Sequence, residues 1–293
     1  MMRKSYSPLR YPGGKSRIYN YIQHLISINN CKTYIEPYAG GAGVALSLII
    51  NGDVEKIMIN DYDKSIYAFW YSVLNYTDDL IQMIIDTDIT IEEWYHQKEV
   101  QLSKNNTTNL LELGFSTLFL NRVNRSGIIK GGVIGGKEQS GLYKMDCRFN
   151  KIDIINRIQL ISEFKNKIKV YNLDAEYFVK QSVSKTKNSF TFFDPPYYEK
   201  GPALYTNYYE HGDHVKLKEA IKKHMKEKNW IVTYDNNENI AEMYANYYKE
   251  RYYLNYSVTK PNKGIEYIIF SDNTLSGDIT SYLSIVGSEN GKS

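Results

Sequence analysis

Apolar and polar positions follow two different periods along the 293 residues of this chain. Short apolar runs typical of buried strands stand at residues 33–38, 56–60, 167–173, 189–193 and 230–234. Helical spacing marks residues 44–50, 152–164 and 214–228. This alternation predicts an α/β fold that ends in a hairpin with arms at residues 252–259 and 266–270, followed by a frayed polar tail over residues 284–293.

The middle of the chain differs, because residues 74–121 show helical periodicity without a strand, with Thr90 and Thr108 as predicted helix caps. A glycine-rich, basic segment of hairpin character follows over residues 121–137. Residues 121–151 hold seven Lys and Arg against two Asp and Glu, a local charge of +5. Such side chains can contact DNA phosphates and base edges, although a solvated charged hairpin has the same pattern. The candidate contact residues are Arg122, Asn124, Arg125, Lys130 and Lys137.

A glycine-rich turn, Ala-Gly-Gly-Ala-Gly at residues 39–43, joins the first predicted strand to the first long helical run. This is the order of the first turn of a dinucleotide-type fold, in which Gly40 lets a ligand approach the backbone. The second strand ends in Asp61, 21 positions after Gly40, where an acid can bind the two hydroxyls of a ribose. Asp174 ends the next strand and can either meet an adenine amine or cap a helix. The spacing predicts an adenosine-bearing cofactor.

The stretch Ser-Phe-Thr-Phe-Phe-Asp-Pro-Pro-Tyr at residues 189–197 combines a buried strand with a rigid loop. Two successive prolines restrict the backbone, so that the Asp194 carboxylate and the Pro195 carbonyl are held as two fixed acceptors. With the ring of Tyr197 beside them, these acceptors can bind the exocyclic amine of an extruded base. An ordinary strand that stops at a proline loop would show the same sequence, so the choice depends on the other motifs.

Near the start of the chain, residues 13–16 read Gly-Gly-Lys-Ser and resemble the end of a phosphate-binding P-loop. The match fails, because Leu9 stands where that motif requires a glycine and no strand leads into it. Lys15 is nevertheless suited to meet a carboxylate and Tyr11 to stack on a ring. The alternative is a flexible N-terminal turn.

Together these motifs resemble the DNA adenine methylase (Dam-like, D12 class) family of S-adenosylmethionine-dependent N6-adenine DNA methyltransferases. The matching pieces run in the family's order, at residues 11–15, 36–43, 60–61, 120–122 and 194–197. The resemblance implies a Rossmann-like S-adenosylmethionine-dependent methyltransferase domain, formed by residues 1–73 and 165–293. Residues 74–164 would be an inserted, mostly helical target-recognition domain that binds DNA.

The same resemblance implies the chemistry. S-adenosylmethionine is the expected cofactor, bound by Tyr11, Lys15, Gly40, Asp61, Asp174 and Asp194. Asp194, Pro195 and Tyr197 form the catalytic set, which would flip an adenine out of double-stranded DNA and direct an in-line methyl transfer to N6. Two alternatives remain: N4-cytosine methylation, where Ser is usual in place of Asp194, and a DNA-binding regulator that does not methylate.

The composition of the chain argues against a membrane protein, an exported protein and a metal site. The chain carries no apolar run near ~18 residues and no signal-peptide pattern, so neither a membrane span nor export is expected. Cys31 and Cys147 lack a Cys-x-x-Cys pairing, which fits a reducing compartment. His211 and His214 have no third ligand nearby in sequence and are expected at the surface rather than on a metal. We therefore expect a cytoplasmic monomer of bacterial, archaeal or phage origin that acts on double-stranded DNA without a metal.

Overall fold

The computed structural model describes residues 6–10, 15–199, 209–255 and 263–287. Its strands form one seven-stranded sheet in the order β3-β2-β1-β4-β5-β7-β6. They are β1 (Thr33–Glu36), β2 (Lys56–Asn60), β3 (Ile168–Tyr171), β4 (Ser189–Phe193), β5 (Asn229–Asp235), β6 (Lys249–Asn255) and β7 (Lys263–Phe270). The first five are parallel, whereas β7 lies antiparallel between β5 and β6. The order β3-β2-β1-β4-β5 is that of a doubly wound Rossmann-type sheet, which confirms the predicted fold class.

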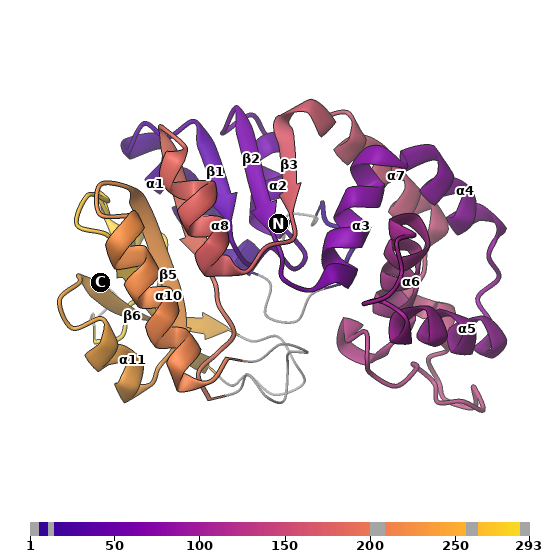
Figure 1. The fold of residues 1–293 in the computed structure, drawn as a ribbon. Coiled ribbons are helices and arrows are strands. Elements are labelled where there is room, and N and C mark those ends of the chain that lie inside the picture. Colours follow the sequence, from indigo (N-terminus) through magenta and orange to yellow (C-terminus); the bar gives the residue numbers. More distant parts are fainter. Residues whose placement is uncertain (1–5, 11–14, 200–208, 256–262, 288–293) are drawn as a thin grey trace.

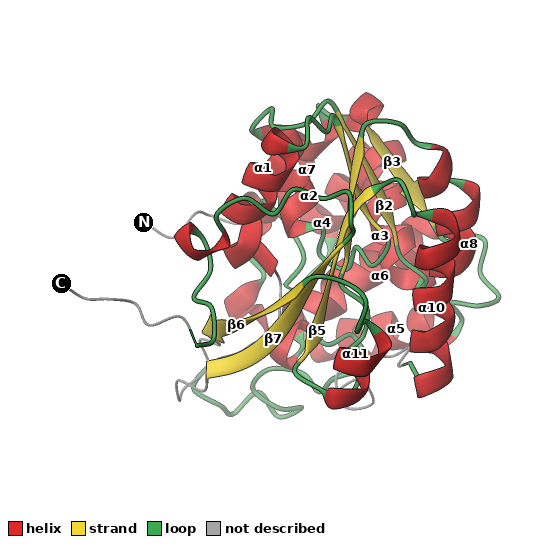
Figure 2. Cartoon of the chain, turned by 90° about the vertical axis from the view of Figure 1, so that its left-hand side faces the viewer, coloured by secondary structure: helices red, strands yellow, loops and turns green. Residues whose placement is uncertain are grey.

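Successive side chains of the central strands face two different cores, because neighbouring residues of a strand point to opposite faces. Tyr34 and Ile57 pack on one face with α1 (Tyr19–Ile28) and α2 (Gly43–Ile50). Ile35 and Met58 pack on the other face with residues of α8 (Ala175–Gln181), α10 (His211–His224) and α11 (Glu238–Met243). Figure 2 shows helices on both sides of the sheet. The central strands are therefore apolar on both faces, as their sequences predict.

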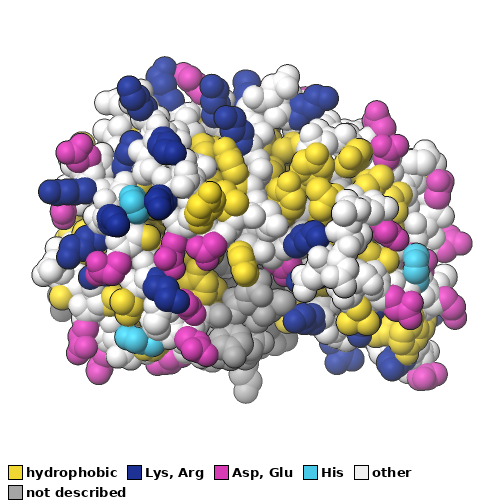
Figure 3. Space-filling model, in the orientation of Figure 1, with side chains coloured by type: hydrophobic (Ala, Val, Ile, Leu, Met, Phe, Trp, Pro, Cys, Tyr) yellow, Lys and Arg dark blue, Asp and Glu magenta, His cyan; other side chains and the backbone are white. Residues whose placement is uncertain are grey.

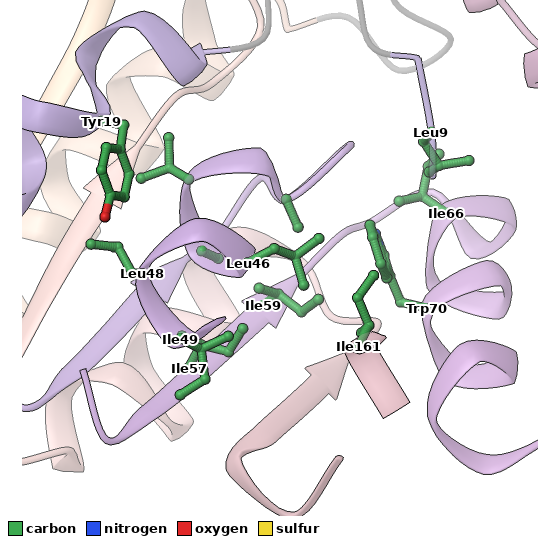
Figure 4. Packing of buried hydrophobic residues seen from close by; sticks show 14 of the residues in the cluster. Leu9, Tyr19, Leu46, Leu48, Ile49, Ile57, Ile59, Ile66, Trp70 and Ile161 are labelled. Carbon is green, nitrogen blue, oxygen red and sulfur yellow. The ribbon is translucent and has the colours of Figure 1, made fainter. Parts of the chain in front are cut away.

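The other helices are α3 (Lys64–Asn75), α4 (Thr77–Asp86), α5 (Ile91–Leu102), α6 (Leu110–Val123) and α7 (Lys151–Ser162). They lie together at one end of the molecule, beyond β3 (Figure 1). α3 joins them to the sheet: Trp70 of α3 and Ile161 of α7 belong to the same buried cluster as Ile59 of β2 (Figure 4). The core is thus continuous from sheet to helices, and the division at residues 74 and 164 stays a prediction.

Close packing of α3 against α6 depends on Gly114. A Cβ at that position would lie 2.7 Å from the Ala68 carbonyl oxygen and 2.6 Å from the Ser72 hydroxyl. Thr90 caps α5 as predicted, since its hydroxyl accepts a hydrogen bond from the Glu93 backbone. The predicted cap at Thr108 is wrong, because the Asn109 side chain accepts from the backbone of Glu112 instead.

The short 3-10 helices are Lys15–Ile18, Arg125–Gly127, Met145–Arg148, Lys165–Lys167, Val183–Lys185 and Ile279–Ser281. The predicted hairpin after α6 has no extended arms among the described residues; one antiparallel bridge, Asn124 to Val133, closes a loop of turns. The tail prediction is wrong at its start, because Ile285 bridges to Tyr252 of β6. No described helix has the length and apolar character that a membrane span requires.

Candidate active site

The ends of β1, β2 and β4 meet at one edge of the sheet, because these three strands are parallel neighbours. Each ends near an acid that the sequence analysis or the structure singles out: Glu36, Asp61 and Asp194. β4 is buried along its whole length, which fixes the point at which its backbone leaves the sheet. The loop that starts at Asp194 is thus anchored by a core strand, as predicted.

Asp194 is bound on one oxygen. Its Oδ1 accepts a hydrogen bond of 2.8 Å from the Thr233 hydroxyl of β5 and lies 3.2 Å from Lys15 Nζ. No described residue donates to its Oδ2 or to the Pro195 carbonyl oxygen. The Asp194 side chain is 27% exposed, so a ligand can reach this carboxylate, whereas Pro195 is a buried residue.

Lys15 and Glu266 form a buried pair beside Asp194, with side chains 4% and 1% exposed. Lys15 Nζ lies 2.7 Å from Glu266 Oε2, closer than it lies to Asp194. Two tyrosine hydroxyls also donate to Glu266: that of Tyr197 at 2.5 Å and that of Tyr252 at 2.6 Å. The ring of Tyr197 lies under the ammonium group, 5.3 Å from Lys15 Nζ. One carboxylate therefore ties the N-terminal segment, the loop after β4 and the β6–β7 hairpin together.

These buried charges shift one another's titration. Burial raises the pKa of Asp194, Lys15 opposes this increase, and the charge of Glu266 adds to it. Burial would lower the pKa of Lys15, but Asp194, Tyr252 and Glu266 together raise it well above its usual value. Burial also raises the pKa of Glu36 to about 8. Lys15 is therefore charged at neutral pH.

The glycine turn has the backbone that its sequence predicts. Gly40 and Ala42 adopt left-handed backbone angles, with φ of +45° and +47°. Asp61 Oδ2 accepts a hydrogen bond of 2.9 Å from Gly40 N, and its Oδ1 accepts one of 2.9 Å from Asp63 N. Trp70 fixes the turn from behind through a 2.9 Å bond to the Gly40 carbonyl. Burial raises the pKa of Asp61 to about 7.

Asp174, another residue of the predicted cofactor set, makes its hydrogen bonds to α8 and, among the described residues, none to the glycine turn. Asp174 caps α8: its Oδ1 accepts hydrogen bonds from the backbone of Glu176 and Tyr177, which is the alternative that its position left open. Tyr11 lies outside the described residues. Tyr62 directly follows Asp61 in the chain and Tyr177 stands three positions after Asp174; the two tyrosines are 63% and 52% exposed. Apolar side chains gather on this face between α8 and α3 (Figure 3).

The two histidines beside the site differ. His211 is exposed and lies 2.8 Å from the Tyr198 hydroxyl. His214 is fully buried, with Nδ1 2.9 Å from the Tyr234 hydroxyl, so the prediction that it lies at the surface is wrong. The apolar face of α10 turns inward at that position, and burial lowers the pKa of His214 to about 4. Among the described residues no group of His, Cys, Asp and Glu has the arrangement of a metal site.

The predicted DNA contacts divide into two sets. Arg125, Lys130 and Lys137 are exposed, whereas Arg122 is 9% and Asn124 0% exposed. The Asn124 amide is bonded within the protein: it donates to the carbonyls at positions 128 and 129 of the segment and accepts from Trp94 Nε1 of α5. Burial, followed by the nearby charge of Arg157, lowers the pKa of Arg122 to about 10.

Asn121 connects this segment to the N-terminal one. Its side chain accepts a 2.7 Å hydrogen bond from Arg10 N and donates 2.8 Å bonds to the carbonyls of Arg10 and Gly127. Gly127 lies so close that a Cβ would stand 2.3 Å from the Arg10 carbonyl oxygen. Arg10 precedes Lys15 by five residues, so the basic segment and the Asp194 site hold the same stretch of chain.

The sequence analysis did not predict three residues of the site: Glu266, Thr233 and Asn121. A signal for Glu266 exists: it alternates with Ile268 and Phe270 along β7, and an acid on an otherwise apolar strand face needs a buried partner. The identity of that partner has no local signal, because Lys15 is 251 positions away.

Comparison with known proteins identifies the family of the chain. The family model of the D12 class N6 adenine-specific DNA methyltransferases matches residues 11–259. The type II methyltransferase M.MjaIII of Methanocaldococcus jannaschii is 25% identical over 203 residues, covering 64% of this chain and 68% of that protein.

Two solved structures also resemble the chain. One is the methyltransferase domain of bacterial-CtHen1-CN, with 10% identity and a TM-score of 0.39, covering 87% of this chain and 97% of that one. The other is the rRNA methyltransferase aviRa of Streptomyces viridochromogenes, with 10% identity and a TM-score of 0.37, covering 92% and 89%. The match over residues 11–259 decides the family: the chain belongs to the D12 class and is an adenine-specific DNA methyltransferase.

Proposed function

We propose that this chain binds S-adenosylmethionine at the glycine turn, flips its target adenine out of double-stranded DNA and directs the methyl group straight to N6. The observation that carries the proposal is a pair of neighbouring acceptors, Asp194 Oδ2 and the Pro195 carbonyl, to which no described residue donates. An adenine N6 amine has two hydrogens, one for each acceptor.

The chain's part in the reaction follows from those two hydrogen bonds. The N6 lone pair is delocalised into the adenine ring, and acceptors on both hydrogens favour a nitrogen whose lone pair can react. S-adenosylmethionine, when bound, supplies a methyl group on a good leaving group. Once the new N–C bond forms, N6 must lose a proton, and the Asp194 carboxylate already accepts a hydrogen bond from it. Thr233 and Lys15 hold the other oxygen, so the carboxylate needs little reorganisation.

The proposed cofactor site fits the residues present. Gly40 and Ala42 turn the chain at the N-terminus of α2, and Gly43 leaves space where a Cβ would stand, with no atom within 4 Å. Asp61 would accept hydrogen bonds from the ribose hydroxyls, using lone pairs that Gly40 and Asp63 leave open. Lys15 would line the same site.

The proposed DNA interface lies on residues 121–151, a segment with a local charge of +5. Arg125, Lys130 and Lys137 are exposed and are proposed to meet phosphates or base edges. Arg122 lies deeper and would reach only a phosphate that approaches closely. Asn124 would shape the segment rather than read a base, because its amide is already bonded within the protein.

The product tests the chemistry. Labelled S-adenosylmethionine and unmethylated plasmid DNA should yield labelled N6-methyladenine, and sequencing of the modified plasmid should locate the target. Labelled N4-methylcytosine as the sole product would overturn the adenine assignment.

Base flipping needs its own test. A duplex with 2-aminopurine at the located target should become more fluorescent when the protein binds, because the base loses its stacking neighbours. A mismatch opposite the target should tighten binding, since less pairing energy is spent on extrusion. Unchanged fluorescence in a duplex that is nevertheless bound would contradict extrusion.

A further inference from the structure

We propose that Glu266 is a positioning residue for methyl transfer: it draws Lys15 away from Asp194 and so keeps the Asp194 carboxylate a strong acceptor for the adenine amine. The inference rests on the proposed role of Asp194. It assigns a task to a β7 side chain that touches neither the amine nor the methyl group.

The geometry supports a division of Lys15 between two carboxylates. Lys15 Nζ lies 2.7 Å from Glu266 and 3.2 Å from Asp194, so the ammonium group is closer to the residue that does not react. Lys15 and Glu266 are almost completely buried, and water cannot take the place of either charge. Without Glu266, the full charge of Lys15 would act on Asp194.

Glu266 itself is fixed from three directions. Lys15 reaches it from the N-terminal segment, Tyr197 from the loop after β4 and Tyr252 from the neighbouring strand β6. Tyr252 stands directly opposite Glu266 in the β6–β7 ladder, so the sheet register sets that contact. Glu266 therefore also holds the hydroxyl of Tyr197, three residues from Asp194.

A carboxylate held by a full ammonium charge is a weaker hydrogen-bond acceptor and a weaker base. Two carboxylates and one ammonium leave this cluster with one excess negative charge, which favours a cationic ligand beside it. The ionisable groups around Asp194 come from the 3-10 helix Lys15–Ile18 and from β1, β6 and β7: Lys15, Tyr34, Glu36, Tyr252 and Glu266. Asp235 of β5 stands opposite Glu266 in the sheet.

Glu266→Gln tests the proposal, because glutamine keeps the shape and removes the charge. We expect kcat to fall about 10- to 100-fold, with the KM values for cofactor and DNA within about threefold. The acid limb of the kcat profile should move to lower pH: the charge of Glu266 raises the pKa of Asp194, and its loss also leaves Lys15 to lower that pKa further. A purely structural role would reduce the active fraction without moving that limb.

Glu250→Gln is the matched control. Glu250 lies on β6 at the molecule's exterior, where it accepts a hydrogen bond from Tyr248, so kcat and its pH profile should not change. Tyr252→Phe removes one donor to Glu266 but no charge, and should leave the acid limb in place. In a Lys15→Met background, Glu266→Gln should cost less than it does alone, because there is no ammonium group left to redirect.

If Glu266→Gln does not fold, Glu266→Asp carries the test. Its shorter side chain keeps the charge but cannot keep the 2.7 Å contact, so the acid limb should move in the same direction by a smaller amount. An acid limb that stays in place in a folded variant, or one that moves to higher pH, overturns the role of Glu266. A wild-type protein that forms no N6-methyladenine would instead contradict the proposed function.

Discussion

The cluster around Asp194 and the basic segment at residues 121–151 satisfy their polar groups in opposite ways. Lys15, Asp194 and Glu266 come from distant parts of the chain and meet in the interior. In the basic segment, the side-chain amides of Asn124 and Gln139 donate to carbonyls three to five residues away. The cations of that segment are left mostly at the surface.

This difference matches two kinds of task. Orientation of one amine requires acceptors fixed to a fraction of an ångström, which buried charges held by several strands can provide. Contact with a long, flexible polyanion requires positive charge more than fixed geometry. Changes in the exposed cations should therefore alter DNA binding without altering Asp194, and changes in the buried cluster should do the reverse.

The largest expected effect comes from Asp194→Ala, which removes one of the two proposed acceptors. We expect kcat to fall by at least about 10³-fold, because no described residue can replace Oδ2, while DNA affinity stays within about threefold. Single-turnover methylation of a located target measures the first quantity and fluorescence anisotropy the second.

Asp272→Ala provides the control, since Asp272 is an exposed acid outside the cluster. Substantial methylation by a folded Asp194→Ala protein would remove Asp194 from the centre of the mechanism. A parallel loss of DNA binding would show that the two regions are less separate than their contacts indicate.

The next effect should appear when Arg125, Lys130 and Lys137 are replaced by Ala together. DNA affinity should fall about 30-fold, and the slope of log K against log salt should decrease by about 2 to 3, because each lost phosphate contact removes about 0.9. kcat at saturating DNA should stay close to that of the wild type. The matched control replaces Lys180, Lys222 and Lys223 on α8 and α10, away from the helical end (Figure 1). An equal loss of DNA affinity in both triple variants would mean that DNA binding depends on the net charge of the protein and not on the basic segment.

Sequence patterns were sufficient to predict the strand ends. Parallel strands bring their carboxyl ends to one edge, so Asp61 and Asp194 could be assigned to one site from their positions after apolar runs. The helix cap at Thr90 was also predictable, because a cap depends only on residues within the first turn of the helix.

Contacts that depend on register were not predictable. Glu266 contacts Tyr252 because of the antiparallel pairing of β6 and β7, and it contacts Lys15 across a separation of 251 positions in the chain. The burial of Asn124 was also missed, since an Asn among glycines and cations has the pattern of a surface turn. Its bond to Trp94 comes from another helix.

A smaller effect concerns Asp61, whose pKa is raised by burial to about 7. A carboxylate can accept hydrogen bonds from both ribose hydroxyls, whereas a protonated carboxyl must donate one. Affinity for S-adenosylmethionine should therefore rise with pH through about 7, and should be about tenfold weaker at pH 6 than at pH 8. Calorimetric titrations across that range measure the dependence. Asp61→Asn should bind weakly at every pH, and a wild-type affinity that does not vary would contradict the ribose contact.

The smallest effect should come from Arg122, which belongs to the basic segment by sequence but to the interior by position. Its Nε has no hydrogen-bond partner among the described residues, and the like charges of Arg157 and Arg10 nearby are opposed by the single carboxylate of Asp153. Arg122→Met should raise the melting temperature by a few degrees, because an apolar side chain replaces a buried cation at a gain of about 1 kcal/mol.

If a DNA phosphate neutralises Arg122 on binding, the same variant should bind DNA about fivefold more weakly and lose about one unit of salt slope. Arg125→Met is the matched control: it should weaken DNA binding without changing the melting temperature, because Arg125 is exposed. A lower melting temperature with unchanged DNA affinity would assign Arg122 to the structure of the segment alone. A higher melting temperature together with weaker DNA binding would show that Arg122 serves DNA binding at a cost in stability, whereas a lower melting temperature with unchanged binding would show that it serves packing.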